Sequence, residues 1–461
     1  MTGAGRSVSD LDLDGLAREA AAEFGIVGAQ VSVLHEGRIA EGVAGITDIA
    51  TGVAVTSDTL FQVGSTTKVL TAALVMSLVE EDRISLDVPV VEQLPGFALS
   101  DPRATATVTP RHLMSMSSGI DNGPYTDHGR GDDAVAKYVD ALVELPQVFL
   151  PGEGYGYSNA STCVSGRLVE HVLGQTWDDA LRERVLEPAG LGDSATLAED
   201  IILRRFALGH EVNEAGKARR LEKWSSPRSK GPSGGTLCST ASDLVRFAHI
   251  FLRDGLALDG TRVLERGPVQ AMQKREVPVP PTLLAEWWGL GPYGKVWDGV
   301  EVMGHSGTNL SGSSYLLWAA ERDVAIATTV NTPGFGYPFA ARLFRELFRE
   351  TADISVPDRP EAPPDVAVDA DRFVGTYAMH SAVLTVEANG NGLTIAGTGE
   401  LLGPDELPPS PLIPLSPTTF LPTNPAIDGR RGWALAFLGP EDAPATHLVN
   451  GFFALRRIAA P

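Results

Sequence analysis

Apolar residues recur at helical spacing in several segments of the first 350 residues, and this periodicity predicts amphipathic or buried helices. The helical segments are residues 8–24, 65–81, 109–115, 132–144, 161–173, 177–185, 239–251 and 338–351. The helix predicted at 65–81 is apolar nearly all round, which is typical of a helix in the middle of a domain. Alternating, Val-rich runs predict strands instead. These runs are 28–34, 38–45, 300–303, 313–318 and 323–330.

The order of these elements indicates the fold class. Residues 28–45 read as a hairpin, the helices come next, and the remaining strands lie at the end of the region. Strands joined as hairpins favour an antiparallel sheet, in which we expect the early and late strands to meet. Residues 1–354 are therefore predicted to form an α+β domain, an antiparallel sheet flanked by helices.

A change of composition marks a second region. Residues 355–369 carry four prolines among acidic residues, which is typical of a linker. Beyond them come short alternating runs, separated by turns rich in Gly, Asn and Pro. These runs are 382–387, 393–396, 433–438 and 452–456. Residues 370–461 are therefore predicted to form a separate all-β domain, a small barrel or a sandwich.

Charge and composition exclude several classes of function. The 461 residues carry 37 Lys and Arg against 58 Asp and Glu, a net charge of −21, which argues against binding to nucleic acid or an anionic membrane. The first 14 residues contain one Arg and no apolar segment, so we expect no signal peptide and a cytoplasmic location. Cys163 and Cys238 make no disulfide framework, and a single bridge between them is not expected. No Cys or His pair has zinc spacing, so we expect no metal site, and nothing in the sequence indicates an organic cofactor.

Ser65 and Lys68 form an S-x-x-K motif at the start of the helix predicted at 65–81. Residues three apart share a helix face, so the lysine side chain is expected beside the serine hydroxyl. Serine needs an adjacent base to act as a nucleophile, and burial makes a lysine lose its proton more easily. The helix N-terminus adds a partial positive charge and an unpaired main-chain N–H near Ser65. The alternative is that this short motif occurs by chance.

A second motif, Tyr157-Ser158-Asn159, follows a Pro- and Gly-rich turn and precedes a predicted helix. The Tyr157 phenol is suited to take the proton of Ser65, if a charged Lys68 lowers its pKa, and to pass it to a leaving group. Asn159 offers both a donor and an acceptor for a substrate amide. The alternatives are that Tyr157 is a core aromatic and that Asn159 is a helix cap.

A third group, His305-Ser306-Gly307-Thr308, leads into a predicted strand. Gly307 allows a substrate to approach the main chain closely, and the N–H of Thr308 is a candidate oxyanion donor. His305 and Ser306 are candidate substrate contacts, although His305 alone reads equally well as a structural histidine. Trp288 follows a proline-rich stretch and is expected either to line the cleft or to pack in the core.

These three motifs, in this order, resemble those of the serine β-lactamase and penicillin-binding-protein superfamily, in its class C-like branch. Residues 109–119 and 233–240 resemble two further segments of that branch. The resemblance implies that Ser65 forms an acyl-enzyme, that Lys68 and Tyr157 share proton transfer, and that Asn159 binds the acyl amide. It also implies an oxyanion hole made by the N–H groups of Ser65 and Thr308.

The chain departs from the β-lactamase pattern at one position. His305 stands where β-lactamases usually carry the lysine of a K-T-G motif, although a His-x-Gly occurs in some D,D-peptidases and esterases of the superfamily. We expect this histidine to make the charge on the substrate side pH-dependent near neutrality. The departure weakens a β-lactamase function and leaves the fold expectation intact.

Three functions compete at this point. We favour a penicillin-binding-protein-type thioesterase, which takes a peptidyl thioester from a carrier protein and closes the peptide head to tail. Residues 373–377 resemble the start of the lipocalin-like domain that accompanies those enzymes, and the absence of an export signal agrees with them. The second is a cytosolic esterase or D-stereoselective aminopeptidase acting on small esters or amides. The third, a non-catalytic binding module, disagrees with the intact Ser65, Lys68 and Tyr157.

Overall fold

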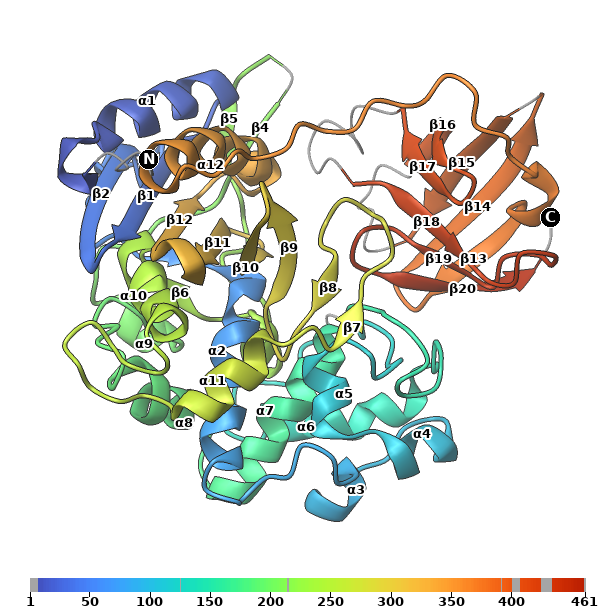
Figure 1. The fold of residues 1–461 in the computed structure, drawn as a ribbon. Helices are drawn as coiled ribbons and strands as arrows, with labels where there is room; N and C mark the ends of the chain where they lie inside the picture. Colours follow the sequence, from blue (N-terminus) through green and yellow to red (C-terminus); the bar gives the residue numbers. More distant parts are fainter. Residues whose placement is uncertain are drawn as a thin grey trace.

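The computed structural model describes residues 7–124, 126–213, 215–390, 392–399, 407–423 and 433–459 (Figure 1). Residues 1–6, part of the segment on which the signal-peptide prediction rests, lie outside these ranges. In the described ranges no helix is both long and apolar enough to cross a membrane. Cytoplasmic location stays a prediction.

The first region is built on an antiparallel sheet of eight strands within the described residues, in the order β2-β1-β12-β11-β10-β9-β8-β7. Its strands are β1 (Gly28–His35), β2 (Arg38–Gly45), β7 (Val277–Pro278), β8 (Trp287–Trp288), β9 (Tyr293–Trp297), β10 (Val300–Thr308), β11 (Ser313–Ala319) and β12 (Val324–Val330). β1 pairs with both β2 and β12, so the early hairpin and the last strand of the region lie side by side. This confirms the predicted antiparallel sheet. β7–β9 were not predicted, because their runs are too short to show a period.

Helices cover both faces of this sheet (Figure 1). α1 (Leu13–Phe24) and α12 (Gly336–Ala352) pack together on one face, and α10 (Ala241–Leu252) packs on β1, β11 and β12 from the other. α1 begins later than the predicted residue 8, because the Asp12 carboxylate caps it by accepting the N–H of Gly15 at 2.9 Å. α2 (Thr67–Val79) is buried along nearly its whole length, as its continuous apolar surface predicts.

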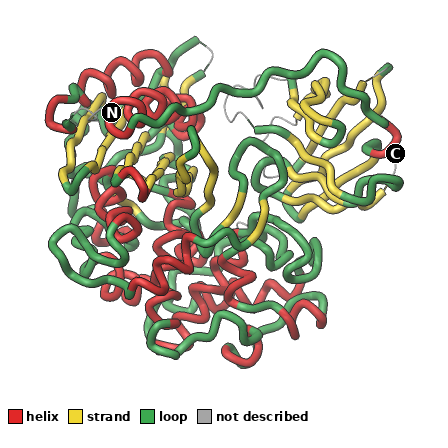
Figure 2. The backbone as a smooth tube through the Cα atoms, in the orientation of Figure 1, coloured by secondary structure: helices red, strands yellow, loops and turns green. Residues whose placement is uncertain are grey.

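The remaining helices gather below the sheet around α2, as Figure 2 shows. They are α3 (Val90–Gln93), α4 (Pro102–Thr107), α5 (Pro110–Met114), α6 (Ala134–Asp140), α7 (Asn159–Leu173), α8 (Trp177–Leu181), α9 (Ala198–Ile201) and α11 (Arg266–Gln273). Short helical turns are η1 (Val8–Asp10), η2 (Gly64–Thr66), η3 (Ala141–Glu144), η4 (Arg182–Leu186), η5 (Arg228–Ser233), η6 (Ala320–Arg322), η7 (Pro333–Phe335) and η8 (Ala370–Arg372). Two small antiparallel pairs join β3 (Phe61–Gln62) to β6 (Cys238–Ser239), and β4 (His210–Val212) to β5 (Ala218–Arg220).

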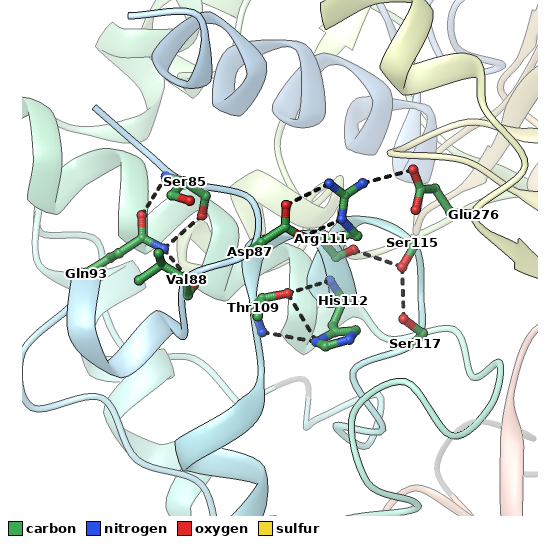
Figure 3. A network of polar contacts seen from close by, with 10 residues as sticks. All are labelled: Ser85, Asp87, Val88, Gln93, Thr109, Arg111, His112, Ser115, Ser117 and Glu276. Carbon is green, nitrogen blue, oxygen red and sulfur yellow. Dashed lines mark hydrogen bonds and ion pairs between the residues drawn. The ribbon is translucent and has the colours of Figure 1, made fainter. Parts of the chain in front are cut away.

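The segment at 109–119 has a structural role (Figure 3). Thr109 caps α5: its hydroxyl accepts the N–H of His112, and the His112 ring contacts the N–H of Thr109 in return. The Arg111 guanidinium bridges Asp87 at 2.7 Å and Glu276 at 2.9 Å. These contacts tie α5 to the loop before α3 and to the segment before β7. The first part of the motif therefore stabilises the helical region.

The C-terminal region forms a closed antiparallel barrel of eight strands within the described residues. Its strands are β13 (Gly375–Met379), β14 (Ala382–Asn389), β15 (Gly392–Thr398), β16 (Leu407–Ser416), β17 (Thr419–Pro422), β18 (Leu435–Leu438), β19 (His447–Val449) and β20 (Ala454–Ala459). β13 pairs with β20 and so closes the barrel. This confirms the predicted all-β region and fits a lipocalin-like barrel. The boundaries at 354 and 370 stay predictions.

The barrel lies beside β7 and β8, at this edge of the sheet, and contacts loops of the first region (Figure 1). The N–H of His380 donates to the Asp121 carboxylate at 2.8 Å, and the His447 ring lies 3.2 Å from the carbonyl oxygen of Val148. The N–H of Ala434 donates to the carbonyl oxygen of Thr282 at 3.0 Å. Polar contacts at three separate places therefore fix the barrel on the first region.

Candidate active site

Ser65 and Lys68 lie where η2 passes into α2. Because the two residues share one helix face, the Lys68 Nζ lies 3.0 Å from the Ser65 Oγ. Lys68 is 1% exposed, whereas Ser65 keeps partial access to solvent. The predicted pairing of hydroxyl and amine is present, with only the hydroxyl open to a substrate.

The Lys68 Nζ has two further partners, both pure acceptors. It donates to the Oδ1 of Asn159 at 2.6 Å and to the carbonyl oxygen of Ser233 at 2.5 Å. Burial lowers the pKa of Lys68 well below its ordinary value. The neighbouring Cys163 opposes this shift of the pKa, and the positive charge of Lys230 adds to it. The environment therefore favours the neutral amine.

Tyr157 comes from the loop before α7, far from Ser65 in sequence. Its ring centroid lies 4.8 Å from the Lys68 Nζ, and the residue is 6% exposed. Ser158 caps α7 by accepting the N–H of Ser161 at 3.0 Å, so the cap is not Asn159. Asn159 turns its carbonyl oxygen to Lys68 instead. The structure therefore brings Ser65, Lys68, Tyr157 and Asn159 together.

The third motif forms the end of β10, whose backbone crosses directly over the start of η2. A Cβ at Gly307 would lie 1.9 Å from the carbonyl oxygen of Val63 and 2.7 Å from the main-chain nitrogen of Ser65. A Cβ at Gly64, whose φ is +54°, would lie 2.7 Å from the main-chain nitrogen of Thr308. Only glycine allows this approach. It brings the backbone at Ser65 and Thr308 together, as an oxyanion hole requires.

His305 is completely buried beside Tyr157, and its Nδ1 lies 2.6 Å from the carbonyl oxygen of Ser306. Burial, reinforced by the nearby Lys68, lowers the pKa of His305 to about 3. The expectation of a charge that changes near neutral pH is therefore wrong, because this imidazole is neutral throughout that range. With Nδ1 protonated toward the carbonyl oxygen, Nε2 keeps its lone pair.

Trp288 is also completely buried. Its ring contacts those of Tyr157 at 5.7 Å and His305 at 5.5 Å between centroids. Burial excludes the direct contact with substrate that the cleft alternative requires. Trp288 therefore packs in the core behind the site, and it supports the rings of Tyr157 and His305.

Several residues of the site were not found from the sequence. Phe452 and Phe453, from the turn between β19 and β20, pack on the Tyr157 ring at 4.9 and 5.8 Å between centroids. No pattern links them to Tyr157, because they lie in another folding region. The carbonyl oxygen of Ser233 was also missed, although its segment carried part of the resemblance. A main-chain acceptor leaves no trace in residue identity.

A small cavity adjoins the site at the junction with the barrel. Its lining includes Asn122, Phe149, Tyr157, Met379 and Phe453.

The described ranges hold no cluster of three or more His, Cys, Asp or Glu that could bind a metal ion. The two cysteines are buried thiols that are not bonded to each other.

Comparisons with known proteins agree with this geometry. Residues 13–348 match the family model described as Beta-lactamase. Penicillin-binding protein 4 of Amycolatopsis lactamdurans is 39% identical over 360 residues, which are 77% of this chain and 94% of that protein. Esterase EstB of Burkholderia gladioli is 27% identical over 365 residues, 69% of this chain and 89% of that esterase.

Likenesses among solved structures extend over both regions. The crystal structure of SurE superposes with a TM-score of 0.79 and 27% identity, covering 97% of this chain and 98% of SurE. SurE with D-Leu superposes with a TM-score of 0.76 and 26% identity. The family model covers most of the chain, and a relative of 39% identity is spanned almost completely. The chain therefore belongs to the Beta-lactamase family, among the serine hydrolases and acyltransferases of the β-lactamase and penicillin-binding-protein superfamily.

Proposed function

We propose that the chain transfers acyl groups through an ester on Ser65. The observation that carries this proposal is the position of the Lys68 Nζ, 3.0 Å from the Ser65 Oγ and between two pure acceptors. A neutral amine has two N–H groups, which match Asn159 Oδ1 and the carbonyl oxygen of Ser233. Its lone pair is then directed at the Ser65 hydroxyl. Lys68 is therefore assigned as the general base for acylation.

Tyr157 is assigned to carry the proton onward. Its ring lies beside Lys68 and lines the cavity at the barrel. As the Ser65 Oγ bonds to the acyl carbon, the bond from that carbon to the leaving group breaks. The proton of Ser65 passes to Lys68 and, through the Tyr157 phenol, to the departing atom. The N–H groups of Ser65 and Thr308 would hold the oxyanion, aided by the N-terminus of α2.

We propose further that the acyl donor is a peptidyl thioester and that release closes the peptide head to tail. In the second half-reaction an α-amine of the same peptide forms a bond to the acyl carbon, and the ester bond to Ser65 breaks. The proton of the amine returns to the Ser65 Oγ. Asn159 would hold the amide of the acyl group, and a peptidyl carrier protein would deliver the thioester.

The likeness to SurE includes the barrel as well as the sheet and helices, and the structure of SurE with D-Leu agrees with a substrate that carries a D-residue, for cyclisation and for hydrolysis alike. One observation supports cyclisation over hydrolysis. The aromatic rings of Phe452, Phe453 and Trp288 surround Tyr157, so the proton-transfer group lies in a dry environment. Excluding water favours attack by a bound amine on the acyl-enzyme.

A second candidate is an esterase or D-stereoselective hydrolase of small substrates. The similarity to esterase EstB of Burkholderia gladioli favours it, because that protein is matched over 89% of its length. The same groups would then serve a water molecule in place of an amine. A non-catalytic binding module would not need the Lys68 amine and the Tyr157 phenol beside Ser65, so this geometry disagrees with that third alternative.

Two measurements test this proposal. A fluorescent fluorophosphonate should label the wild type and Ser225→Ala, which alters an exposed serine, but not Ser65→Ala. A linear peptide thioester with a D-residue at its C-terminus should then give the cyclic product by mass spectrometry. Labelling that persists in Ser65→Ala would overturn the acyl-Ser65 assignment. A purely hydrolysed product, with fast turnover of p-nitrophenyl esters, would establish the esterase instead.

A further inference from the structure

Two adjacent serines on β11, Ser313 and Ser314, are completely buried and have no part in the mechanism above. Neighbouring residues of a strand point to opposite faces of the sheet, so the two hydroxyls face different surroundings. β11 pairs with β10 in a register that places Ser313 opposite Thr308 and Ser314 opposite Gly307. Both serines therefore lie beside the end of β10, which carries the Thr308 N–H.

The Ser314 hydroxyl holds η2, the turn that contains Ser65. Its Oγ donates to the carbonyl oxygen of Val63 at 2.6 Å and lies 2.7 Å from the Thr66 Oγ1. A serine hydroxyl has one hydrogen. Because the Val63 carbonyl takes that hydrogen, the Thr66 hydroxyl donates to Ser314. Residues on both sides of Ser65 are thereby tied to β11 by buried hydrogen bonds.

The Ser313 hydroxyl holds Thr308 in the same manner. Its Oγ donates to the carbonyl oxygen of Pro333 at 3.0 Å and lies 3.1 Å from the Thr308 Oγ1. Since Ser313 also has only one hydrogen to give, the Thr308 hydroxyl donates to it. Each of the two serines therefore accepts from a threonine and donates to a main-chain carbonyl.

The main chain of the β10–β11 hairpin directs the Thr308 N–H away from β11. The N–H of Asn309 donates to the carbonyl oxygen of Gly312 at 2.9 Å, so these two residues form a hydrogen-bonded pair. Such pairs alternate with non-hydrogen-bonded pairs along an antiparallel ladder. Thr308 and Ser313 are the next pair, so the Thr308 N–H points out of the ladder. Its nitrogen lies beside η2, because a Cβ at Gly64 would be 2.7 Å away from it.

An oxyanion hole stabilises the transition state only when both of its donors point at the same oxygen. We propose that Ser313 and Ser314 are positioning residues of the oxyanion hole. Ser314 holds the turn that carries the Ser65 N–H, and Ser313 holds the side chain of Thr308. β11 is then the common support of two donors that come from distant parts of the sequence. This inference rests on the proposed function, because it assigns a task to the two serines only if an oxyanion forms at Ser65.

Single-turnover acylation by a p-nitrophenyl ester tests the role of Ser314. Ser314→Ala leaves the Val63 carbonyl and the Thr66 hydroxyl without their common partner, so η2 can shift relative to β10. Loss of one oxyanion donor slows catalysis about 10²–10³-fold, and a displaced donor should cost less, so we expect an acylation rate constant about 10- to 100-fold lower. The dissociation constant of the ester should change little. Ser77→Ala is the matched control, because it removes another buried hydroxyl that donates to a main-chain carbonyl, and it should keep the wild-type rate constant.

An arylboronic acid separates an effect on the oxyanion hole from a general loss of packing. The Ser65 Oγ bonds to boron as its proton passes to Lys68, and an oxygen already on boron takes the position of the oxyanion. The affinity for this analogue should weaken in Ser314→Ala by about the same factor as the acylation rate constant. Ser314→Thr, which retains the hydroxyl, should recover both values. Slower acylation with an unchanged affinity for the boronic acid would overturn the proposal.

Two further variants cover a possible folding defect of Ser314→Ala. Thr66→Val removes the hydroxyl that donates to Ser314, and Ser313→Ala removes the partner of Thr308. Each should lower the acylation rate constant and weaken the binding of the boronic acid together. Wild-type values in a folded Ser314→Ala or Thr66→Val would overturn the role of Ser314, and wild-type values in Ser313→Ala would overturn that of Ser313. Failure of the wild type to form an acyl-enzyme would instead overturn the proposed function, so the two failures are distinguishable.

Discussion

The main-chain N–H of Tyr157 donates a 3.0 Å hydrogen bond to the carbonyl oxygen of Phe452, a residue of the barrel. The two rings also pack, with centroids 4.9 Å apart. Gly156 lies under the barrel as well, since a Cβ there would come within 3.2 Å of the Ala454 Cβ. The residue assigned to proton transfer is therefore held by both regions of the chain, and the barrel forms part of the site.

Removing the Phe452 ring should loosen Tyr157 and admit water. We expect Phe452→Ala to lower the acylation rate about 10-fold and to raise the share of hydrolysed product. The substitution removes one of the aromatic rings that surround Tyr157, so water reaches the acyl-enzyme more easily. Product analysis by mass spectrometry after reaction with a peptide thioester measures both effects. Phe452→Leu, which retains apolar volume, should recover most of the wild-type product ratio. An unchanged ratio of cyclic to hydrolysed product in Phe452→Ala would show that the Phe452 ring does not control access of water.

Lys68→Met and Tyr157→Phe should each slow acylation of Ser65 by about 10²–10⁴-fold, since each removes a group that moves the proton. Stopped-flow measurement with a chromogenic ester separates this step from deacylation. Tyr155→Phe is the matched control, because its buried hydroxyl has no hydrogen-bond partner among the described residues. A wild-type acylation rate in either test variant would remove that residue from the mechanism.

Gly307→Ala should abolish acylation. Its Cβ would collide with the carbonyl oxygen of Val63, a backbone atom that a rotamer change cannot move away. β10 would have to retreat from η2, which separates the N–H groups assigned to the oxyanion. Gly192→Ala, whose added Cβ meets no atom within 4 Å, should retain wild-type activity. Normal labelling of Gly307→Ala by a fluorophosphonate would contradict the close approach of β10.

Stability should fall with rising pH because of Glu170. Burial raises the pKa of Glu170 to about 7. The N–H of Trp177 and the Arg167 guanidinium favour the charged carboxylate and only partly oppose this shift of the pKa. The folded chain therefore keeps this proton between about pH 4.5 and 7, where the unfolded chain loses it. The contribution of the neutral Glu170 to the free energy of unfolding is full below pH 4.5 and is lost as pH rises through 7. The loss is on the order of 3 kcal/mol.

Urea unfolding at several pH values measures this contribution. Between pH 5 and 8 the free energy of unfolding of the wild type should fall relative to that of Glu170→Gln, because glutamine cannot ionise. Glu183→Gln, at an exposed side chain, should run parallel to the wild type. A constant difference between Glu170→Gln and the wild type would show that Glu170 ionises normally.

The sheet, the buried helix and the barrel were predictable because each depends on local periodicity. The pairing of Ser65 with Lys68 followed from helix geometry, and the glycine at 307 indicated a close approach of main chain. Lys68 was also expected to be buried, since its helix is apolar all round.

Features that depend on three-dimensional surroundings were not predictable. The charge state of His305 is set by burial among Trp288, Tyr157 and Tyr293, which come from three different segments. The contact of Phe452 with Tyr157 depends on how the barrel docks.

The pairing of β1 with β12 has a consequence for synthesis of the protein. The hairpin of β1 and β2 is complete at residue 45, but its other neighbour ends at residue 330. A ribosome adding about 5–20 residues per second needs roughly 15–60 s to cover that interval. Meanwhile β1 has an open edge, and Ser65 lacks the strand that brings Thr308 to it. A nascent chain is therefore exposed to misassembly, and potential chaperone capture, long before it can react with a substrate.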